Sequence, residues 1–465
     1  MSLEDRLSFA DTEGSSWSVK QKFLFLKEFL ELSQTKNNDS GKFDFDLLCR
    51  TLRSFWSIAV PKCQASGQIN LDRNDFLHEA VGLYCKLIEF IVKNLEICFD
   101  THVKKIFLKD CFPEIAALYF MYVDHSCAWT NQQYSSTVTH SVKALLSCCG
   151  GSHDLSSYFQ NAGKDCSSMV KATLLLVKKG LGDKNTMKNA AYAKVVQEIS
   201  CVLSETTAAA NISNILPLSL SCLDDCQDDV VMSGISCIST VLNLVPGAEL
   251  QMYGWVSVVF EALCKKMHEK TRAVVDAALP LIFKCLKILD STSVSANRSR
   301  AEQYSRYNRV METLISKISM VSDDKLLKIY FTHLKTLMSA MNTAVLYHFN
   351  SLMQIFLHHI SFDSVYLPQV LLSLNTFISL TWLHCKQYPA ELYSALFKIM
   401  IRNELMSPSL QKDKNKVFIE EYVFDAFKLL ARVNKDYTES LLSRFPDRAP
   451  YTKFKSRILI STNAT

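Results

Sequence analysis

The chain has 465 residues, of which 48% are hydrophobic and 21% are charged, and it contains only 12 Gly and 10 Pro. So few backbone breakers exclude collagen-like and low-complexity chains, and they argue against a β-sandwich, whose strands need frequent Gly/Pro turns. The high hydrophobic content excludes a disordered chain. The net charge of +5 is small for this length and indicates no strong field for nucleic acid or an anionic membrane. Composition therefore favours helices, arranged in about three domains or in one elongated array.

The N-terminal residues predict no export signal. Residues 1–6 (MSLEDR) are polar and acidic, and no apolar stretch follows them directly. The most apolar segment, 367–383, is interrupted by four polar residues and falls short of the roughly 18 apolar residues that span a membrane. We therefore expect a soluble, cytoplasmic protein without a membrane partner, and the nucleus is a further location to consider. Residues 1–16 are expected to be disordered.

The 16 cysteines are scattered through apolar segments, and no C-x-x-C motif occurs. In a chain without an export signal, most of them are interpreted as small buried hydrophobes in a reducing compartment.

Residues 17–205 form an irregular N-terminal helical region. Helical patterns of apolar residues occur over 17–32, 72–99, 113–123, 131–149 and 166–177. The segments 33–42, 61–70 and 150–165 lack this periodicity and predict looser structure. Such irregularity is expected where terminal repeats cap a helical array.

Residues 206–445 predict paired helices at regular spacing. The predicted pairs are 210–222 with 227–244, 250–267 with 271–289, 302–320 with 323–341, 344–360 with 364–384, and 390–402 with 417–434. Their internal turns fall near residues 226, 269, 322, 362 and 410, which are 43, 53, 40 and 48 residues apart. Two helices every 40–47 residues or so are typical of HEAT repeats. We therefore predict an all-α fold, a HEAT-like helical-repeat solenoid (α-α superhelix), with a polar loop at 290–300 and a basic C-terminal tail over 446–465.

The segment 215–246 shows the pattern of one repeat. Asp224 and Asp225 end its first helix, and Asp228 and Asp229 lie where the second begins, close to the positive end of the helix dipole. Gly234 lies in the middle of the second helix, where it costs about 1 kcal/mol relative to Ala. A close approach by a neighbouring helix would explain this glycine. The absence of a basic residue near position 231 argues against a ladder of buried Asp–Arg pairs between repeats.

A search for catalytic and metal-binding motifs finds none of the common ones. Nucleotide-binding glycine motifs, H-E-x-x-H and G-x-S-x-G are all absent. Cys222 and Cys226, with the four aspartates between residues 224 and 229, form the densest group of potential metal ligands. Because zinc favours C-x-x-C pairs with further Cys or His nearby, two small core cysteines around a solvated acidic turn are the better interpretation. We therefore expect no catalytic, cofactor-binding or metal-binding residues, and a protein that is not an enzyme.

Basic residues gather at 178–188, at 265–272 and at 432–457, where Arg444 and Arg448 contribute to a local net charge of +4. A nucleic-acid surface needs such groups on one face together with a strong overall charge. Solvated helix ends explain them more simply, so nucleic acid is not expected as a partner. The C-terminal group remains a candidate contact for an acidic protein surface.

The segment 216–250 resembles a known family. The resemblance is carried by Leu216, Pro217, Ser219, Leu220, Asp224, Asp225, Gly234, Cys237, Ile238, Asn243, Val245, Pro246 and Leu250. In this order they are similar to the Tel-two-interacting protein two family, which has LP-x-SL, a DD pair and a glycine-containing helix ending in NVP-like residues. The similarity continues weakly to residue 400 and so covers roughly the C-terminal half.

The resemblance implies the smallest subunit of the Triple T co-chaperone complex. Its partners would be Tel-two and Tel-two-interacting protein one, and phosphatidylinositol-kinase-related kinases, including the TOR and DNA-damage kinases, would be its clients. The ninety-kilodalton heat-shock chaperone would participate indirectly. The family has no known catalytic residues.

Function would then consist of protein binding by a scaffold. The candidate contact residues are Asp224, Asp225, Asp228, Asp229, Arg444 and Arg448, chosen for their charge and expected exposure. It is equally open that Asp224 and Asp225 only end one helix and help to start the next. A different helical scaffold or transport adaptor is the alternative, followed by a nucleic-acid-binding solenoid.

Overall fold

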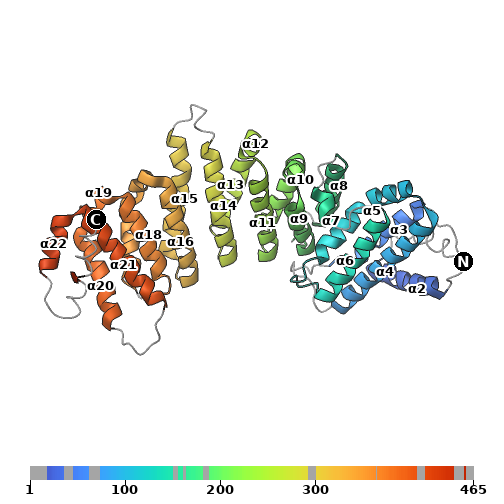
Figure 1. Ribbon diagram of the computed structural model, residues 1–465, viewed down its shortest axis with the longest axis horizontal. Helices are drawn as coiled ribbons and strands as arrows, with labels where there is room; N and C mark the ends of the chain where they lie inside the picture. The colour runs from blue at the N-terminus through green and yellow to red at the C-terminus, as the bar shows by residue number, and fades with distance from the viewer. Residues whose placement is uncertain are drawn as a thin grey trace. The chain divides into compact units, whose positions relative to one another are not determined.

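The computed structural model describes residues 18–35, 45–61, 74–149, 155–160, 164–181, 188–291, 300–362, 364–405, 414–444 and 455–456. Every regular element in these ranges is a helix, which confirms the all-α prediction (Figure 1). The segment 1–16, most of the loop at 290–300, and the tail 446–465 apart from residues 455–456 lie outside the described residues. The chain forms two compact units, Met1–Trp255 and Val256–Thr465, which are taken in turn.

The first unit contains eleven described α-helices and one 3-10 helix. They are α2 (Val19–Thr35), α3 (Phe45–Phe55), η1 (Trp56–Ile58), α4 (Asn74–Cys98), α5 (Thr101–Tyr122), α6 (Gln132–Cys148), α7 (Leu155–Gln160), α8 (Lys164–Leu181), α9 (Ala190–Val202), α10 (Glu205–Leu223), α11 (Asp228–Leu244) and α12 (Gly247–Met252). Consecutive pairs stack on one another: α8 packs on α10, and α9 packs on α11. Towards the N-terminus α4 packs on α6, and α5 packs on α8 and α9.

Sequence periodicity located most of these helices and missed others. The helices α3, α7, α9 and the first half of α5 were not predicted, and α7 lies inside the segment 150–165 that was expected to be loose. The helix α7 has only six residues, which is too short to display a 3.6-residue period. The missed first half of α5, residues 101–112, buries only Phe107, Leu108, Cys111 and Phe112, which are too few to form a clear apolar stripe.

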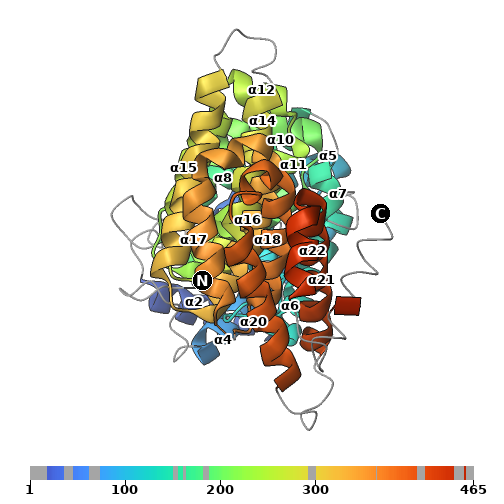
Figure 2. The ribbon, with the colours of Figure 1, turned by 90° about the vertical axis from the view of Figure 1, so that its left-hand side faces the viewer.

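The second unit is a regular stack of helix pairs. Its helices are α13 (Trp255–Lys266), whose first residue is the last of the first unit, α14 (Arg272–Ser291), α15 (Arg300–Met320), α16 (Asp324–Met341), η3 (Asn342–His348), α17 (Phe349–Ile360), α18 (Leu367–Leu380), α19 (Trp382–Cys385), α20 (Pro389–Leu405), α21 (Lys414–Val433) and α22 (Lys435–Ser443). One layer contains α15, α17 and α20 in contact order, and the other contains α14, α16, α18 and α21 (Figures 1 and 2). This two-layer stack is the HEAT-like helical repeat that the spacing predicts.

The predicted pairs match the observed helices with local differences. The helix α10 begins five residues earlier than expected. The helix predicted over 250–267 is two helices, because Gly254 adopts a φ of +72° between α12 and α13. The helix predicted from 344 begins as the 3-10 turn η3 before α17 continues it. The turn expected near residue 410 lies outside the described residues.

Side-chain caps mark where several helices begin. Asp100, Ser204, Asp323 and Asn434 each accept a hydrogen bond from a backbone N–H in the first turn of α5, α10, α16 and α22 respectively. Such caps satisfy donors that the helix itself leaves unpaired. At α16 the Asp323 carboxylate accepts a 3.0 Å hydrogen bond from the backbone N–H of Lys325.

Candidate protein-interaction surface

The family-like segment folds as the helices α10 and α11, which pack closely along their length. Leu216 is buried in α10, and Pro217 lies inside the same helix. Gly234 in α11 faces the α10 backbone: a Cβ atom built on it would lie 2.8 Å from the carbonyl oxygen of Ser219. The close approach that Gly234 suggested is therefore confirmed. At the far end of α11, Pro246 is the N-cap residue of α12.

The acidic turn between α10 and α11 presents most of its carboxylates to solvent. Asp224 ends α10 as its C-cap residue, and Asp228 and Asp229 form the first turn of α11. These three residues are exposed, whereas Asp225 is half-buried. The predicted helix end and helix start are both confirmed. Carboxylates at the start of α11 interact favourably with the partial positive charge of that helix end.

The Asp225 carboxylate accepts two backbone hydrogen bonds that connect separate parts of the chain. One carboxylate oxygen accepts a 2.8 Å hydrogen bond from the backbone N–H of Lys188, and the other accepts a 2.9 Å bond from the N–H of Gln227. The Gln227 side chain in turn donates to the carbonyl oxygen of Lys188 at 2.9 Å. Asp225 and Gln227 thus fasten the chain just before α9 to the turn between α10 and α11. The structural interpretation of Asp225 is supported, and a role for it in partner contact stays a prediction.

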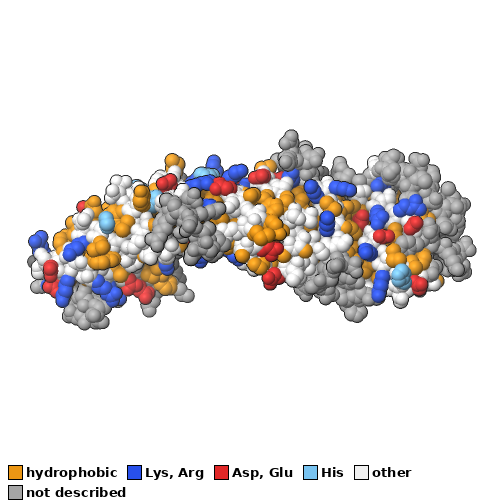
Figure 3. Space-filling view, turned by 90° about the horizontal axis from the view of Figure 1, so that it is seen from above, with side chains coloured by type: hydrophobic (Ala, Val, Ile, Leu, Met, Phe, Trp, Pro, Cys, Tyr) orange, Lys and Arg blue, Asp and Glu red, His pale blue; other side chains and the backbone are white. Residues whose placement is uncertain are grey.

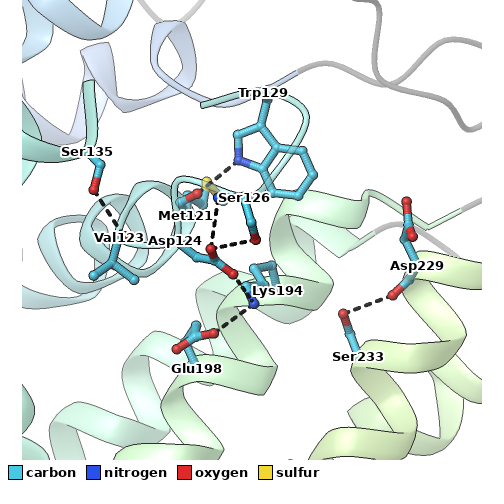
Figure 4. Close-up of polar contacts among 10 residues, drawn as sticks. All are labelled: Met121, Val123, Asp124, Ser126, Trp129, Ser135, Lys194, Glu198, Asp229 and Ser233. Atoms are coloured by element: carbon cyan, nitrogen blue, oxygen red, sulfur yellow. Dashed lines mark hydrogen bonds and ion pairs between the residues drawn. The ribbon is translucent and has the colours of Figure 1, made fainter. Parts of the chain in front are cut away.

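A second polar cluster lies beside this region in the first unit (Figure 4). Lys194 in α9 forms 2.9 Å ion pairs with Asp124, just after α5, and with Glu198 one turn further along α9. Asp124 also accepts hydrogen bonds from the backbone N–H and the hydroxyl of Ser126. Trp129 covers the turn and donates its indole N–H to the carbonyl oxygen of Met121 at 2.9 Å. These contacts hold the turn after α5 against α9.

The charges in this cluster reinforce one another. Hydrogen bonds from Ser126 and Lys194 hold the pKa of Asp124 well below its usual range. Burial opposes the charge on Lys194, but the hydrogen bonds and negative charges of Glu198 and Asp124 outweigh it and raise its pKa. No local sequence signal could have found this cluster, because Asp124 and Lys194 are 70 residues apart.

The C-terminal basic group is described only in part. Arg444 is the exposed C-cap residue of α22, a position where a cation complements the negative helix end. Arg448 lies outside the described residues. Nearby, Lys435 and Glu439 form a loose exposed pair with a distance of 3.9 Å. A role for Arg444 and Arg448 in partner contact stays a prediction.

In the second unit, ion pairs connect neighbouring repeats. Arg309 of α15 makes a two-fold contact with Glu261 of α13, at 2.8 and 2.9 Å. Arg272 of α14 makes a similar contact with Asp323, the cap of α16, at 2.8 and 3.1 Å. The sequence argued against a ladder of buried Asp–Arg pairs between repeats. Both of these ion pairs are exposed, so neither is a buried pair of that kind.

Most of the described cysteines lie in the core, as Cys222 does, but Cys226, which was expected there, is exposed. Nine of the thirteen described cysteines are buried, and all thirteen are free. Burial raises the pKa of Cys237 to about 12 and also raises the pKa of Cys222. Both thiols are therefore protonated at neutral pH and poor nucleophiles. Among the described residues, no three His, Cys, Asp or Glu side chains come together as a metal site.

The fold and these contacts define a class of protein: a HEAT-like helical-repeat protein whose described polar clusters connect helices to one another. Proteins of this class expose extended helix faces and commonly act by binding other proteins. Within the described residues, no helix has both the length and the apolar character needed to cross a membrane.

The curated relatives that the chain matches share one name. It is 19% identical over 337 residues to TELO2-interacting protein 2 of Homo sapiens, a match that covers 71% of this chain and 65% of the relative. The proteins of the same name from Rattus norvegicus and Mus musculus are 24% identical over 162 residues and 21% identical over 232 residues. These two matches cover 35% and 50% of this chain, and 32% and 45% of the relatives. The chain thus spans less than two thirds of the length of the curated relatives that it matches. No protein-family model matches the chain.

Solved structures similar to the chain include importins. Kap95p in its complex with RanGDP has a TM-score of 0.49 and 14% identity, and the match covers 95% of this chain and 52% of that one. Yeast importin-β (Kap95p) alone gives a TM-score of 0.47 at 14% identity, covering 99% and 54%. An engineered protein gives 0.41 at 13% identity, covering 94% and 98%. Identity this low is no evidence for a shared function.

Proposed function

We propose that the chain is a non-catalytic scaffold subunit of a Triple T-type co-chaperone assembly. Its direct partners in this proposal are a TELO2 protein (Tel-two) and a Tel-two-interacting protein one. The observation that carries the proposal is the similarity over 337 residues to a human protein that is named for interaction with TELO2. The family-like string from Leu216 to Leu250, which folds as one tightly packed repeat, supports it.

The biological role follows from the assembly. In the proposal, the complex supports the maturation and stability of phosphatidylinositol-kinase-related kinases, including the TOR and DNA-damage kinases. The heat-shock chaperone machinery acts on these kinases through the complex and needs no contact with this chain. Binding is the activity that stacked helix pairs suit best, because each pair adds surface without requiring a reactive group. Cytoplasm and nucleus are the proposed locations.

The proposal is tested by purifying the tagged full-length chain from its own cells and quantifying TELO2 in the eluate. We expect TELO2 and one further large helical-repeat protein in near-stoichiometric amounts. Depletion of the chain is expected to lower the levels of the kinases without lowering their messenger RNA. Recovery of transport cargo instead of TELO2, or steeply salt-dependent binding to DNA or RNA, would replace the proposal by one of the alternatives.

The acidic turn is the proposed contact within this function. Charge reversal at Asp228 and Asp229 removes the exposed negative charge at the start of α11 and leaves the Asp225 hydrogen bonds in place. We expect the double variant, Asp228→Lys with Asp229→Lys, to recover less TELO2. Glu205→Lys is the matched control, since Glu205 is exposed in the first turn of α10 and has a similar position relative to the helix dipole. Equal recovery with all three proteins would remove the acidic turn as a contact.

A further inference from the structure

The second unit contains a segment that is almost free of formal charge. From Asn342 to Cys385, across η3, α17, α18 and α19, the 44 residues include a single Asp, Glu, Lys or Arg, namely Asp363, which lies outside the described residues. At the average of 21% for the whole chain, a segment of this length would carry about nine charged residues. Solvated helix faces usually carry such residues, so their loss needs a physical reason.

Burial within the fold does not supply that reason. On α17, the residues Asn350, Ser351, Gln354 and His358 are exposed, and these are positions where Lys and Glu are common on other helices. Five large hydrophobic side chains of the same segment are also exposed: Tyr347, Phe362, Val365, Trp382 and Leu383. Hydrophobic side chains reach the surface at several places on this unit, which is at the left in Figure 3. Depletion of charge together with exposed aromatic residues is the composition found at the centre of protein–protein interfaces.

A groove between α15 and α17 forms the hollow part of this surface. The groove has a volume of about 570 Å³. One wall includes Ile315 of α15 and Val321 just after it, and the other includes Gln354 and Ile355 of α17. Among the described residues that line it, none is Asp, Glu, Lys or Arg. Exposed apolar side chains lie next to the groove. Met320, which is 80% exposed, stands in the sequence between the lining residues Ser319 and Val321. At the same end Phe362 contacts the ring of His358, with 5.0 Å between the ring centroids.

We propose that this α15–α17 groove binds one apolar helix face of a partner protein, through contacts that lack formal charges. A helix suits the groove because α17, with 12 residues, forms about 18 Å of wall, enough for roughly three turns. An anionic membrane is the poorer fit, because helices that lie on such membranes carry Lys and Arg on their polar side, and α17 has neither. The inference rests on the scaffold role proposed above, but it does not require the partner to be TELO2.

Site-specific photo-crosslinking in the cell tests the proposal with the full chain. A benzoylphenylalanine placed at Gln354 is inside the groove, and one placed at Thr332 is the control, because Thr332 is exposed on α16 in the other layer. We expect position 354 to give one discrete adduct that position 332 does not give. Mass spectrometry should then assign the crosslink to a helix of the partner whose contacting face is apolar and without charged residues.

A matched pair of charge insertions provides the second measurement. Ser351→Arg places a charge at the groove wall, and Ser339→Arg places the same charge on an exposed position of α16. Because a charge cannot be buried against an apolar face without a partner, we expect Ser351→Arg to reduce the adduct by about tenfold or more. Ser339→Arg should change it less than about twofold. The helical circular dichroism of both variants checks folding, and the crosslink from position 354 in the wild-type background stands independently of them.

The outcomes separate this proposal from the proposed function. An adduct with an apolar helix of a protein outside the TELO2 assembly, when no TELO2 is recovered with the chain, keeps the groove proposal and overturns the proposed function. No adduct from position 354, while TELO2 is still recovered, overturns the groove proposal alone. An adduct of two copies of this chain, a crosslink to a charged surface, or binding of the chain to anionic vesicles that Ser351→Arg strengthens, would also overturn it.

Discussion

Gly234 of α11 and Ser219 of α10 are as close as two helix backbones allow, since a Cβ atom on the glycine would lie only 2.8 Å from the serine carbonyl oxygen. The same atom would be 3.1 Å from the Cβ of Cys222. Neither the Ser219 carbonyl oxygen nor the Cys222 Cβ is the flexible end of a side chain. An added Cβ at residue 234 would therefore force α10 and α11 apart. This contact fixes the distance between the two helices of the repeat that carries the family-like residues.

We therefore expect Gly234→Ala to destabilise the chain in spite of the better helix propensity of alanine. Overpacking of this kind costs about 1–3 kcal/mol, which exceeds the roughly 1 kcal/mol gained from propensity. The free energy of unfolding, measured by urea titration, gives the result. The control is Gly82→Ala in α4, where an added Cβ would meet nothing within 4 Å and a small gain is expected. Equal responses of the two variants would contradict the close approach.

Removal of the Asp225 carboxylate should loosen the chain before α9. In Asp225→Ala, the backbone N–H groups of Lys188 and Gln227 lose their acceptor, at a cost of about 1–2 kcal/mol. Hydrogen–deuterium exchange should show faster exchange at these two amides. Asp224→Ala, one residue earlier and exposed, is the control and should leave both amides protected. Unchanged protection in Asp225→Ala would mean that other contacts hold this segment.

The Asp124–Lys194 pair should make stability depend on pH at both extremes. Asp124 has a lowered pKa in the fold, so its contribution is present above the unfolded value near 3.8 and is lost as the pH falls through the folded value. Lys194 has a raised pKa, so its contribution is present below the unfolded value near 10.5 and is lost as the pH rises through the folded one. In the range between these limits the pair is fully charged.

Asp124→Asn therefore should lower the free energy of unfolding by about 1 kcal/mol at neutral pH, a modest value because the Asp124 side chain is 32% exposed and partly screened. The difference from wild type should shrink below about pH 4. Glu79→Gln, which neutralises the exposed pair of Lys27 with Glu79, is the control and should have little effect. A difference that does not change at acid pH would show that the charge of Asp124 is unimportant.

His359 should make the second unit sensitive to mild acid. Its ring is buried and shares a 3.0 Å hydrogen bond with Tyr366, and burial together with the charge of His358 lowers its pKa to about 4. The neutral form therefore stabilises the fold above the unfolded value of 6.5, and this contribution is lost as the pH falls from there towards 4.

In His359→Gln, the fall in stability between pH 7 and pH 4 should be smaller than in wild type by about 1–2 kcal/mol. Urea titrations at a series of pH values measure it. His268→Gln changes an exposed histidine of the same unit and is the control; its profile should stay close to that of the wild type. Parallel pH profiles for wild type and His359→Gln would exclude His359 as the sensitive group.

Sequence periodicity was sufficient for the long helices of the second unit and for their pairing, although it did not predict α22. Apolar residues recur there on one side of long helices, and caps such as Asp323 are local signals. The first unit was harder, because α7 has six residues and the first half of α5 buries only four of its residues. The aspartates at the turn between α10 and α11 could be placed at helix ends from the sequence, but their separate tasks could not.

By itself, the amino-acid sequence determined what depends on neighbours a few residues away: helical class, repeat spacing, helix ends, and the need for a close contact at Gly234. Only the tertiary structure decided which helix supplies that contact, that Asp225 holds Lys188 from 37 residues away, and that Asp124 pairs with Lys194. It also revealed that the charge-poor segment has exposed faces beside a groove. The reason is geometric: a helix's period fixes which side of it is apolar, whereas the stacking of helices fixes which side chains from distant repeats meet.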